Sequence, residues 1–451
     1  MFLLFPKNNF VMITIDNVVF TNNKMKIVDG TKCSIEFYVV PNGVKTIGNG
    51  AFQGNNNIKT VIFPSSCNLL EPSAFSRCEN LESVIMDQSQ IVTISERCFD
   101  GCSKLKEVKF SNSIREIGSE AFSNSGLEQL DLQAYPNLKI HPFCFSGSSL
   151  KEVTVPRLSP RMFINCQSLE KVTITEPIRE IPKLTFYGCE KLKNFDIPDT
   201  VTIIGYQSFY NTGIQNLTLP PNLKKLERCS FNWDRINTIT SKSREFMYID
   251  GTLYDSDYNI YCCKTKDFPC NFVIPNITVK EGAFENNTYI KELVCSFPIE
   301  FEHCSFQGCT SLKRVNIITP NIIGNPFKNC YDLRSVVIRG CNTISQCGFS
   351  RCNQLKYVDL EVEVLNSSFI VCDNLTKVTL RNIKNLGSNI FRNCPKLETI
   401  MFDIPPYQIV EVDKDCFLNL HSLKNILVPK GELWYFKRIL NKNLHQFLKE
   451  Y

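Results

Sequence analysis

One pattern of apolar positions recurs along most of the chain. It begins with a Phe, places Cys or a small polar residue three positions later and a Leu or Ile six positions later, and ends with apolar residues nine and eleven positions after the Phe. The copies that begin at Phe75 and Phe306 show it clearly. Such spacing predicts an array of stacked coils in which each coil contacts only its neighbours. Sixteen copies are present, with the Phe at residues 52, 75, 99, 122, 145, 163, 186, 209, 231, 284, 306, 327, 349, 369, 391 and 417.

Each copy predicts two short strands. The run from Leu81 to Met86 has the L-x-x-L-x-L spacing of a leucine-rich-repeat strand, and most intervals are 20–24 residues, within the range of that class. β-branched residues before the Phe, as in Val44 and Ile47, predict a second strand on the opposite wall. Pro64 lies between the two, where a turn is expected. Stacking would bury the Phe side chains as a column, which accounts for 33 Phe beside 2 Trp. The predicted fold is a leucine-rich-repeat β-solenoid of about 16 repeats.

Both ends of such an array need a cover, and the sequence offers one at each end. A polar turn at Asn22 and Asn23 predicts an N-terminal hairpin, and apolar residues at three- and four-residue spacing from Leu433 to Tyr451 predict a helix. That helix is either a cap or, given its Lys and Arg residues, a membrane-surface helix. We expect a β-hairpin cap over residues 1–43, repeats one to nine over 44–240, a β-hairpin insertion over 241–275, repeats ten to sixteen over 276–430 and an amphipathic capping helix over 431–451.

The expected insertion is rich in tyrosine. Tyr248, Tyr254, Tyr258 and Tyr261 either form a binding surface, since tyrosine is enriched at interfaces, or pack against the flank of the solenoid. The sequence leaves both interpretations open.

Cysteine is abundant, with 22 copies, but its positions argue against disulfides and zinc. The position three residues after the Phe holds Asn55 or Thr212 in other repeats, so it requires a small side chain that hydrogen-bonds inside a turn. We expect reduced structural thiols, with oxidation between neighbouring coils as the alternative. Cys262, Cys263 and Cys270 lack paired C-x-x-C spacing and a nearby His, so no metal site is expected. Nine cysteines share the repeat position: Cys78, Cys102, Cys166, Cys189, Cys309, Cys330, Cys352, Cys372 and Cys394.

Other chemistry is absent from the sequence pattern. No phosphate-binding glycine loop, H-E-x-x-H or G-x-S-x-G is present, and the adjacent pair His303 and Cys304 has no third group beside it. We therefore expect no enzyme and no cofactor. A formal net charge of +5 over 451 residues gives no support for nucleic acid or a membrane surface as partner. No run approaches the length of a membrane-spanning helix, and the N-terminal nine residues do not form a signal peptide.

The repeat resembles the BspA-type leucine-rich repeats of bacterial and protozoan surface proteins. The resemblance is visible in Val44–Phe52 and in Phe186–Pro198, and it covers about residues 40–430. It implies a β-solenoid with a recognition surface, in a family associated with adhesion to host or partner proteins and without catalytic residues to transfer. It favours the cell surface, whereas the lack of a recognisable export signal favours the cytoplasm.

The outward positions of the first strand mark where a partner would bind. They are slightly acidic in repeats one to nine and clearly basic in repeats ten to sixteen. We expect a protein or glycoprotein partner on this sheet face, for either an adhesion protein or an intracellular scaffold; a merely solvated face is the alternative. The predicted partner-binding residues are Lys291, Lys313, Arg314, Arg334, Lys356, Tyr357, Lys377 and Lys424.

Overall fold

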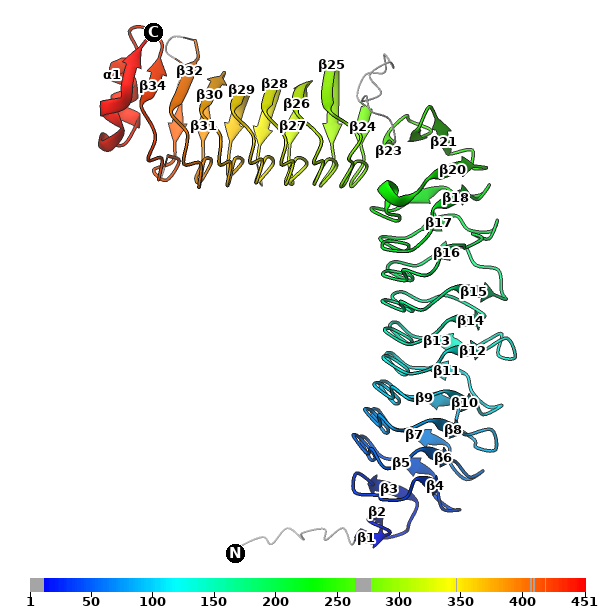
Figure 1. The fold of residues 1–451 in the computed structure, drawn as a ribbon. Helices are drawn as coiled ribbons and strands as arrows, with labels where there is room; N and C mark the ends of the chain where they lie inside the picture. Colours follow the sequence, from blue (N-terminus) through cyan, green and yellow to red (C-terminus); the bar gives the residue numbers. More distant parts are fainter. Residues whose placement is uncertain (1–11, 264–276, 346, 406–407, 409, 418) are drawn as a thin grey trace, which may run out of the picture. The chain divides into compact units, whose positions relative to one another are not determined.

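The structure is a computed structural model that describes residues 12–263, 277–345, 347–405, 408, 410–417 and 419–451. The chain divides into two compact units, Met1–Ile239 and Thr240–Tyr451, called unit 1 and unit 2 (Figure 1). The expected N-terminal segment before residue 12, much of the expected insertion after residue 263 and Cys270 lie outside the described residues. Each unit is a β-solenoid, so the predicted leucine-rich-repeat fold is confirmed.

Unit 1 has two walls of short strands, because most coils contribute one strand to each wall. The first wall begins just after the Leu or Ile of each repeat, and the second lies just before the next repeat Phe. The first-wall strands are β4 (Phe37–Val39), β6 (Thr60–Ile62), β8 (Ser83–Ile85) and β10 (Glu107–Lys109) in one sheet, β12 (Gln129–Asp131), β14 (Glu152–Val155) and β15 (Lys171–Ile174) in another, and β18 (Asn216–Leu219) paired with β20 (Thr238–Ser241).

The second wall of unit 1 starts with an antiparallel hairpin. Strand β1 (Met12–Ile15) pairs with β2 (Val18–Thr21), which pairs with β3 (Lys26–Asp29), and β3 then pairs in parallel with the first repeat. This hairpin covers the edge that the first second-wall strand would otherwise expose. The other second-wall strands are β5 (Thr46–Ile47), β7 (Leu69–Leu70), β9 (Thr93–Ile94), β11 (Glu116–Ile117), β13 (Lys139–Ile140), β16 (Glu180–Ile181), β17 (Ile203–Ile204) and β19 (Lys225–Leu226), with a 3-10 turn at Trp233–Arg235.

Unit 2 is built around one fifteen-stranded sheet. It opens with β21 (Phe246–Ile249), β22 (Thr252–Asp255) and β23 (Ile260–Cys263), which pair antiparallel to one another. Within this segment Tyr254 is buried and Tyr258 is exposed. The parallel strands that follow are β24 (Ile277–Val279), β25 (Glu292–Phe301), β26 (Arg314–Ile318), β27 (Asn321–Ile322), β28 (Ser335–Ile344), β29 (Tyr357–Leu365), β30 (Lys377–Arg381), β31 (Asn385–Leu386), β32 (Thr399–Asp403), β33 (Glu411–Val412) and β34 (Asn425–Val428).

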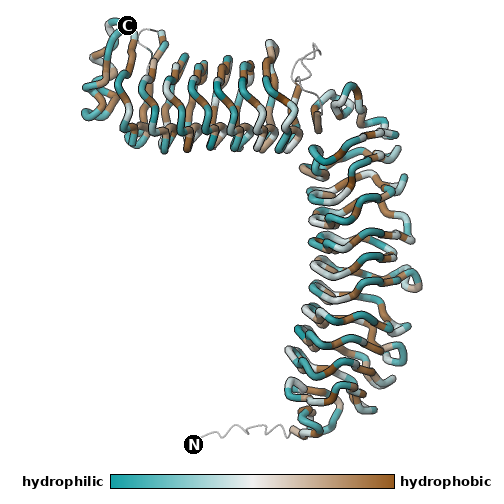
Figure 2. Tube along the Cα trace, viewed as in Figure 1, coloured by the Kyte–Doolittle hydropathy of each residue, from teal (hydrophilic) through white to brown (hydrophobic). Residues whose placement is uncertain are grey.

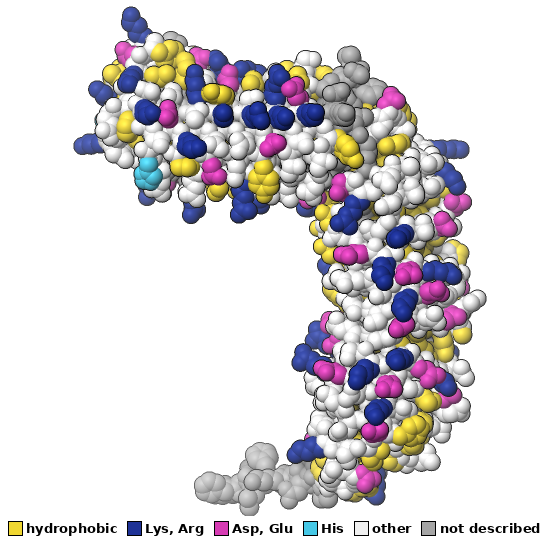
Figure 3. Space-filling model, viewed as in Figure 1, with side chains coloured by type: hydrophobic (Ala, Val, Ile, Leu, Met, Phe, Trp, Pro, Cys, Tyr) yellow, Lys and Arg dark blue, Asp and Glu magenta, His cyan; other side chains and the backbone are white. Residues whose placement is uncertain are grey.

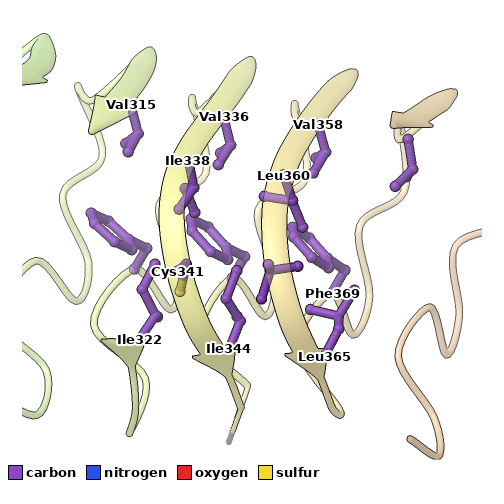
Figure 4. Packing of buried hydrophobic residues seen from close by; sticks show 14 of the residues in the cluster. Val315, Ile322, Val336, Ile338, Cys341, Ile344, Val358, Leu360, Leu365 and Phe369 are labelled. Carbon is purple, nitrogen blue, oxygen red and sulfur yellow. The ribbon is translucent and has the colours of Figure 1, made fainter. Parts of the chain in front are cut away.

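The two strands of a coil merge at several coils of unit 2, which differs from the predicted strand, turn and second strand. Strand β28 runs for 10 residues and β29 for 9. Both bend through the corner while still paired to each other (Figure 4). No proline interrupts either run, and Gly340 at the bend has a positive φ of 63°, a conformation that costs glycine little. Pairing between neighbouring coils therefore continues where unit 1 has a turn.

The C-terminal helix is shorter than the sequence pattern predicts. Helix α1 covers only Leu433–Ile439, a 3-10 segment follows at Lys442–Phe447, and Leu448–Glu450 form strand β35. Strand β35 pairs in parallel with β34, the last coil. The spacing of the apolar residues suits a helix, but the edge of β34 provides backbone partners that an extended segment satisfies. The expected helix over 431–451 is thus wrong after Ile439.

Stacked phenylalanines form the core of each unit, and apolar stretches recur along both (Figure 2). From Phe52 to Phe231 in unit 1, successive ring centroids lie 4.9–5.9 Å apart. From Phe284 to Phe417 in unit 2, they lie 4.4–6.3 Å apart. All these rings are buried, so the Phe column is core and not a ligand site.

The repeated cysteines hold neighbouring coils together. Each of the nine thiols donates to the carbonyl oxygen of the repeat Phe in the preceding coil, at 2.9–3.3 Å. Asn287 in the same position donates to the Cys263 carbonyl at 2.9 Å. Burial raises the pKa of the Cys78 thiol to about 12 and that of Cys166 to about 11. None of the 21 described cysteines is in a disulfide.

Candidate partner-binding surface

The residue after the Leu or Ile of each repeat lies at the start of the first wall, and these residues stack into a row that we call the post-Leu row. In unit 2 the backbone N–H of Lys313 donates to the Lys291 carbonyl at 2.7 Å, and Arg334 donates to Lys313 at 2.8 Å. Lys356 donates to Arg334 at 2.9 Å. The same contact continues along the coils, so the row reads Lys291, Lys313, Arg334, Lys356, Thr376, Glu398 and Lys424.

The first four residues of this row form a run of cations, which we call the cationic ladder. Lys291, Lys313, Arg334 and Lys356 are all exposed, and none is in an ion pair within the described part of the chain. Adjacent strands lie about 4.8 Å apart, so four positive charges follow one another in a line of about 14 Å. A line of Lys and Arg side chains is visible across unit 2 in Figure 3.

The other predicted site residues lie around the ladder, and two of them are neutralised. Arg314, Tyr357 and Lys377 belong to the next row, in which Arg314 pairs with Glu292 at 2.7 Å. Lys424 lies in the same row as the ladder but three coils beyond Lys356, and it pairs with Glu398 at 2.7 Å. The structure therefore brings together four of the eight residues as an unpaired run and separates Lys424 from them.

The equivalent row of unit 1 has a different charge pattern. Backbone contacts stack Glu36, Lys59, Glu82 and Lys106 in one stretch. Lys59 pairs with Glu36 at 2.8 Å, and this hydrogen bond raises the pKa of Lys59. The pattern continues through Glu128, Lys151 and Glu170. Acidic and basic residues alternate, so each cation has an anion on the neighbouring coil.

This alternation is not apparent from the overall charge of the outward positions. Repeats one to nine look slightly acidic because other rows of the same face also carry acidic residues, such as Glu107 and Asp131. Reading the single position after each Leu or Ile would have separated the rows. The signal was therefore present in the sequence but required the register to be known.

Exposed tyrosines flank the cationic ladder. Tyr289 lies two residues before Lys291 and Tyr331 lies three residues before Arg334, with 43% and 44% of their surface exposed. Tyr357 directly follows Lys356 and is 58% exposed. Of these three, only Tyr357 is among the predicted partner-binding residues. Tyr289 and Tyr331 precede the strand, but the repeat places each of them a few residues from a ladder cation.

Other candidate chemistry lies elsewhere or is not found among the described residues. A hollow of about 300 Å³ is lined by Asn389, Arg392 and Asp415, and one of about 420 Å³ is lined by Arg179 and Lys224; neither includes the ladder. No group of three or more His, Cys, Asp or Glu residues in the described ranges is placed to hold a metal ion. Within the same ranges, every helix is too short or too polar to cross a bilayer.

Comparison with known families gives a direct match to the repeat. The profile of the BspA type leucine-rich repeat region matches residues 31–151, 134–240, 157–291, 277–397 and 362–436. The chain belongs to the BspA-type leucine-rich repeat family. The resemblance noted in the sequence is thereby confirmed, and this BspA-type protein matches its family over both units.

Solved structures with a similar fold include several bacterial proteins. A leucine-rich repeat protein from Bacteroides ovatus is 19% identical, with a TM-score of 0.47, and the match covers 99% of this chain and 97% of that one. A leucine-rich cell surface protein from Faecalibacterium prausnitzii is 20% identical, with a TM-score of 0.45, over 89% and 97% of the two chains. The pneumococcal vaccine antigen PcpA is 16% identical, with a TM-score of 0.35, over 98% and 99%. No curated protein matches the BspA-type chain.

Proposed function

We propose that this BspA-type protein is a non-enzymatic recognition protein of the adhesion or surface-antigen type, which binds a protein or glycoprotein partner on the first-wall face of unit 2. The observation that carries the proposal is the cationic ladder, since four neighbouring coils expose a cation with no ion-pair partner among the described residues. The partner-binding set is Lys291, Lys313, Arg314, Arg334, Lys356, Tyr357, Lys377 and Lys424.

The physical basis of the proposal is that, among the described residues, the cations of the unit 2 ladder have no neighbouring carboxylates in their row, whereas the cations in the post-Leu row of unit 1 have them. Like charges about 4.8 Å apart repel one another, and an acidic partner removes that repulsion when it binds. Such a row also attracts an acidic partner before contact, which raises the association rate. Because the side chains are exposed, salt screens the attraction. Binding should therefore weaken steeply as ionic strength rises.

The first test asks whether the protein is exposed on the cell surface. Intact, unpermeabilised source cells are treated with an added protease, and cleavage of the chain is followed with antibodies against each unit. Cleavage on intact cells is the expected result. Protection until the cells are permeabilised would contradict the adhesion proposal.

The second test measures attachment directly. Beads coated with wild-type protein, or with the K313E/R334E variant, are applied to host-type cell monolayers. We expect attachment that falls by about tenfold in the variant, because two of the four unpaired cations are reversed. The control is R314Q, because Arg314 is already paired with Glu292 and is expected to have a smaller effect. Equal attachment of wild type and K313E/R334E would remove the ladder from the proposal.

An intracellular scaffold is the second candidate function, and one observation favours it. All described cysteines except Cys304 and Cys347 are buried, and no disulfide joins two of the described cysteines. Thiols in such number persist most readily in a reducing compartment. Protection of the chain on intact cells in the first test would make this the working function.

A further inference from the structure

We propose that the cationic ladder of unit 2 binds an acidic polysaccharide, whose chain runs across the strands with about one sugar on each coil. The inference rests on the proposed function, because it names the chemistry of the partner at the same surface. Its ligand is a linear glycan that carries sulfate or carboxylate groups, such as the glycan part of a glycoprotein.

The four cations of the ladder follow one another along a line. Backbone hydrogen bonds hold these residues in one row. The N–H of each residue donates to the carbonyl oxygen of the preceding one, in the order Lys291, Lys313, Arg334 and Lys356. Their spacing is the strand spacing of about 4.8 Å, and it is uniform. An extended chain of pyranose rings advances by a similar distance per sugar, and long exposed Lys and Arg side chains reach charged groups on either side of such a chain. Charged groups along the glycan therefore meet cations from successive coils.

An extended acidic peptide fits this spacing less well. Side chains on one face of a strand recur every second residue, which is about 6.6–6.8 Å. Across the three intervals of the ladder, that spacing falls out of register by more than one coil. An acidic helix comes closer, with about 5.4 Å per turn, but its side chains fan out around the axis. A polysaccharide carries its charged groups along a flexible chain that can lie along the row, and for this reason it is the partner we propose.

Exposed aromatic side chains accompany the ladder in the chain. Tyr289 and Tyr331 lie two and three residues before a ladder residue, and Tyr357 directly follows Lys356. A tyrosine ring offers a flat apolar face with a hydroxyl group, which suits contact with sugars.

The post-Leu row of unit 1 has the same strand spacing as the ladder but a different sequence of charges. The row alternates Glu36, Lys59, Glu82 and Lys106, so a polyanion meets a repelling carboxylate on every second coil. The same strand spacing therefore gives an attractive row in unit 2 and a neutral row in unit 1. This difference sets the variants for the test.

The experiment measures binding of fluorescein-labelled heparin, a sulfated uronic-acid polysaccharide, to the full chain at several salt concentrations. Labelled dextran is the neutral control, poly-glutamate is the acidic peptide and poly(dT) is the nucleic acid. The K313E/K356E variant makes the ladder alternate as unit 1 does. The K45E/K224E variant has the same change in net charge, at exposed lysines of unit 1 that lie outside the post-Leu row.

We expect wild-type protein to bind heparin in a salt-dependent way and dextran not at all. Affinity for heparin should fall about tenfold or more in K313E/K356E and less than about twofold in K45E/K224E. The E82K/E128K variant gives unit 1 an uninterrupted run of cations, and it should increase the amount of heparin bound per chain. Circular dichroism of each variant confirms that it is folded.

Several results would overturn the inference. An equal loss in K45E/K224E would show that only net charge matters, and heparin binding no tighter than dextran would exclude an acidic glycan. If poly-glutamate or poly(dT) binds more tightly than heparin and depends on Lys313 and Lys356, the partner is another macromolecule and the polysaccharide proposal is wrong, although the ladder remains a binding surface. If no polyanion depends on these residues, the proposed binding surface fails as well.

Discussion

Units 1 and 2 share one repeat, one kind of core and one backbone register, but they differ in the charge of the post-Leu row. In unit 1 Lys151 has the Glu128 carboxylate 2.6 Å away on the neighbouring coil. In unit 2 the neighbours of Arg334 in the same row are Lys313 and Lys356. A solenoid brings equivalent positions within about 4.8 Å of each other, so the sign of one residue per repeat decides whether charges cancel or add.

The corner between the walls is a second difference. Unit 1 has separate short strands with a turn between them, as at β6 and β7, whereas β28 and β29 of unit 2 bend without a break. The thiol position differs too, since unit 2 has Cys309, Cys330 and Cys352 on successive coils and unit 1 mixes Cys with Ser, Thr and Asn. The charge of the post-Leu row, the corner between the walls and the residue at the thiol position thus all differ between two units that share one repeat.

The largest expected effect tests whether the two phenylalanine columns stabilise their units separately. The Phe349 ring stacks on Phe327 at 5.0 Å and on Phe369 at 5.2 Å. We expect F349A to cost about 3–5 kcal/mol of unfolding free energy, because it removes a buried ring and leaves a cavity. The matched variant F122A should do the same in unit 1. Hydrogen exchange should show lost protection in the substituted unit alone; equal loss in both would mean that the units unfold together.

The thiols predict a loss of stability at alkaline pH. Burial raises the pKa of Cys352 well above its usual value, so the thiol stays protonated in the folded chain. In the unfolded chain it ionises above about pH 8.5, and stability then decreases by about 1.4 kcal/mol per pH unit for each thiol until the folded pKa is reached. We expect the C309S/C352S variant to lose less stability than wild type between about pH 9 and pH 10.5, because burial raises the pKa of both thiols. Parallel urea melts that show the same alkaline loss for both proteins would contradict this account.

The next largest effect on the free energy of unfolding is expected from Asp359, a partly buried carboxylate of unit 2. Asp359 is partly desolvated, but its hydrogen bonds to Arg381 and Arg339 outweigh this and lower its pKa. The equivalent residue of unit 1, Asp131, accepts a backbone N–H from Gln133 and has no ion pair within the described part of the chain. We expect D359N to cost about 1–2 kcal/mol at neutral pH and D131N less than about 0.5.

The direction of the pKa shift determines how the contribution of Asp359 to the free energy of unfolding changes with pH. Because the folded pKa of Asp359 is lowered, its stabilisation is present above the unfolded value of about 3.9 and is lost as pH falls through the folded pKa. Urea melts at neutral pH should separate D359N from wild type, and melts in strong acid should not. A difference that persists in acid would point to a contact other than the ion pairs.

The smallest expected effect is the change in melting temperature when the charges of the two post-Leu rows are altered. Making the unit 2 row alternate with K313E/K356E should raise the melting temperature at low salt by less than about 3 °C, because exposed ion pairs contribute little. E82K/E128K should lower it by a similar amount through repulsion in unit 1. Both shifts should vanish at high salt. A shift that persists there would have to come from a cause other than exposed charge.

The spacing of apolar residues in the sequence predicts most of the fold, but it does not predict the structure of the C-terminal segment. The spacing of the repeat Phe residues predicts coils, core and class, because each coil can bury its apolar face only against the next. The helix expected up to Tyr451 ends instead at Ile439, since the edge of β34 pairs with Leu448–Glu450. Local apolar spacing carries no information about such an edge.

By itself, the sequence determined the repeat, the column of Phe, the structural thiols and the residues that bear the charges. The tertiary structure decided which charges are neighbours. Arg314 and Arg334 look equivalent in the sequence, but Glu292 on the adjacent strand pairs with Arg314, whereas Arg334 lies between Lys313 and Lys356. The reason is that charge compensation depends on contacts across coils, some 22 residues apart in the chain, which only the strand register establishes.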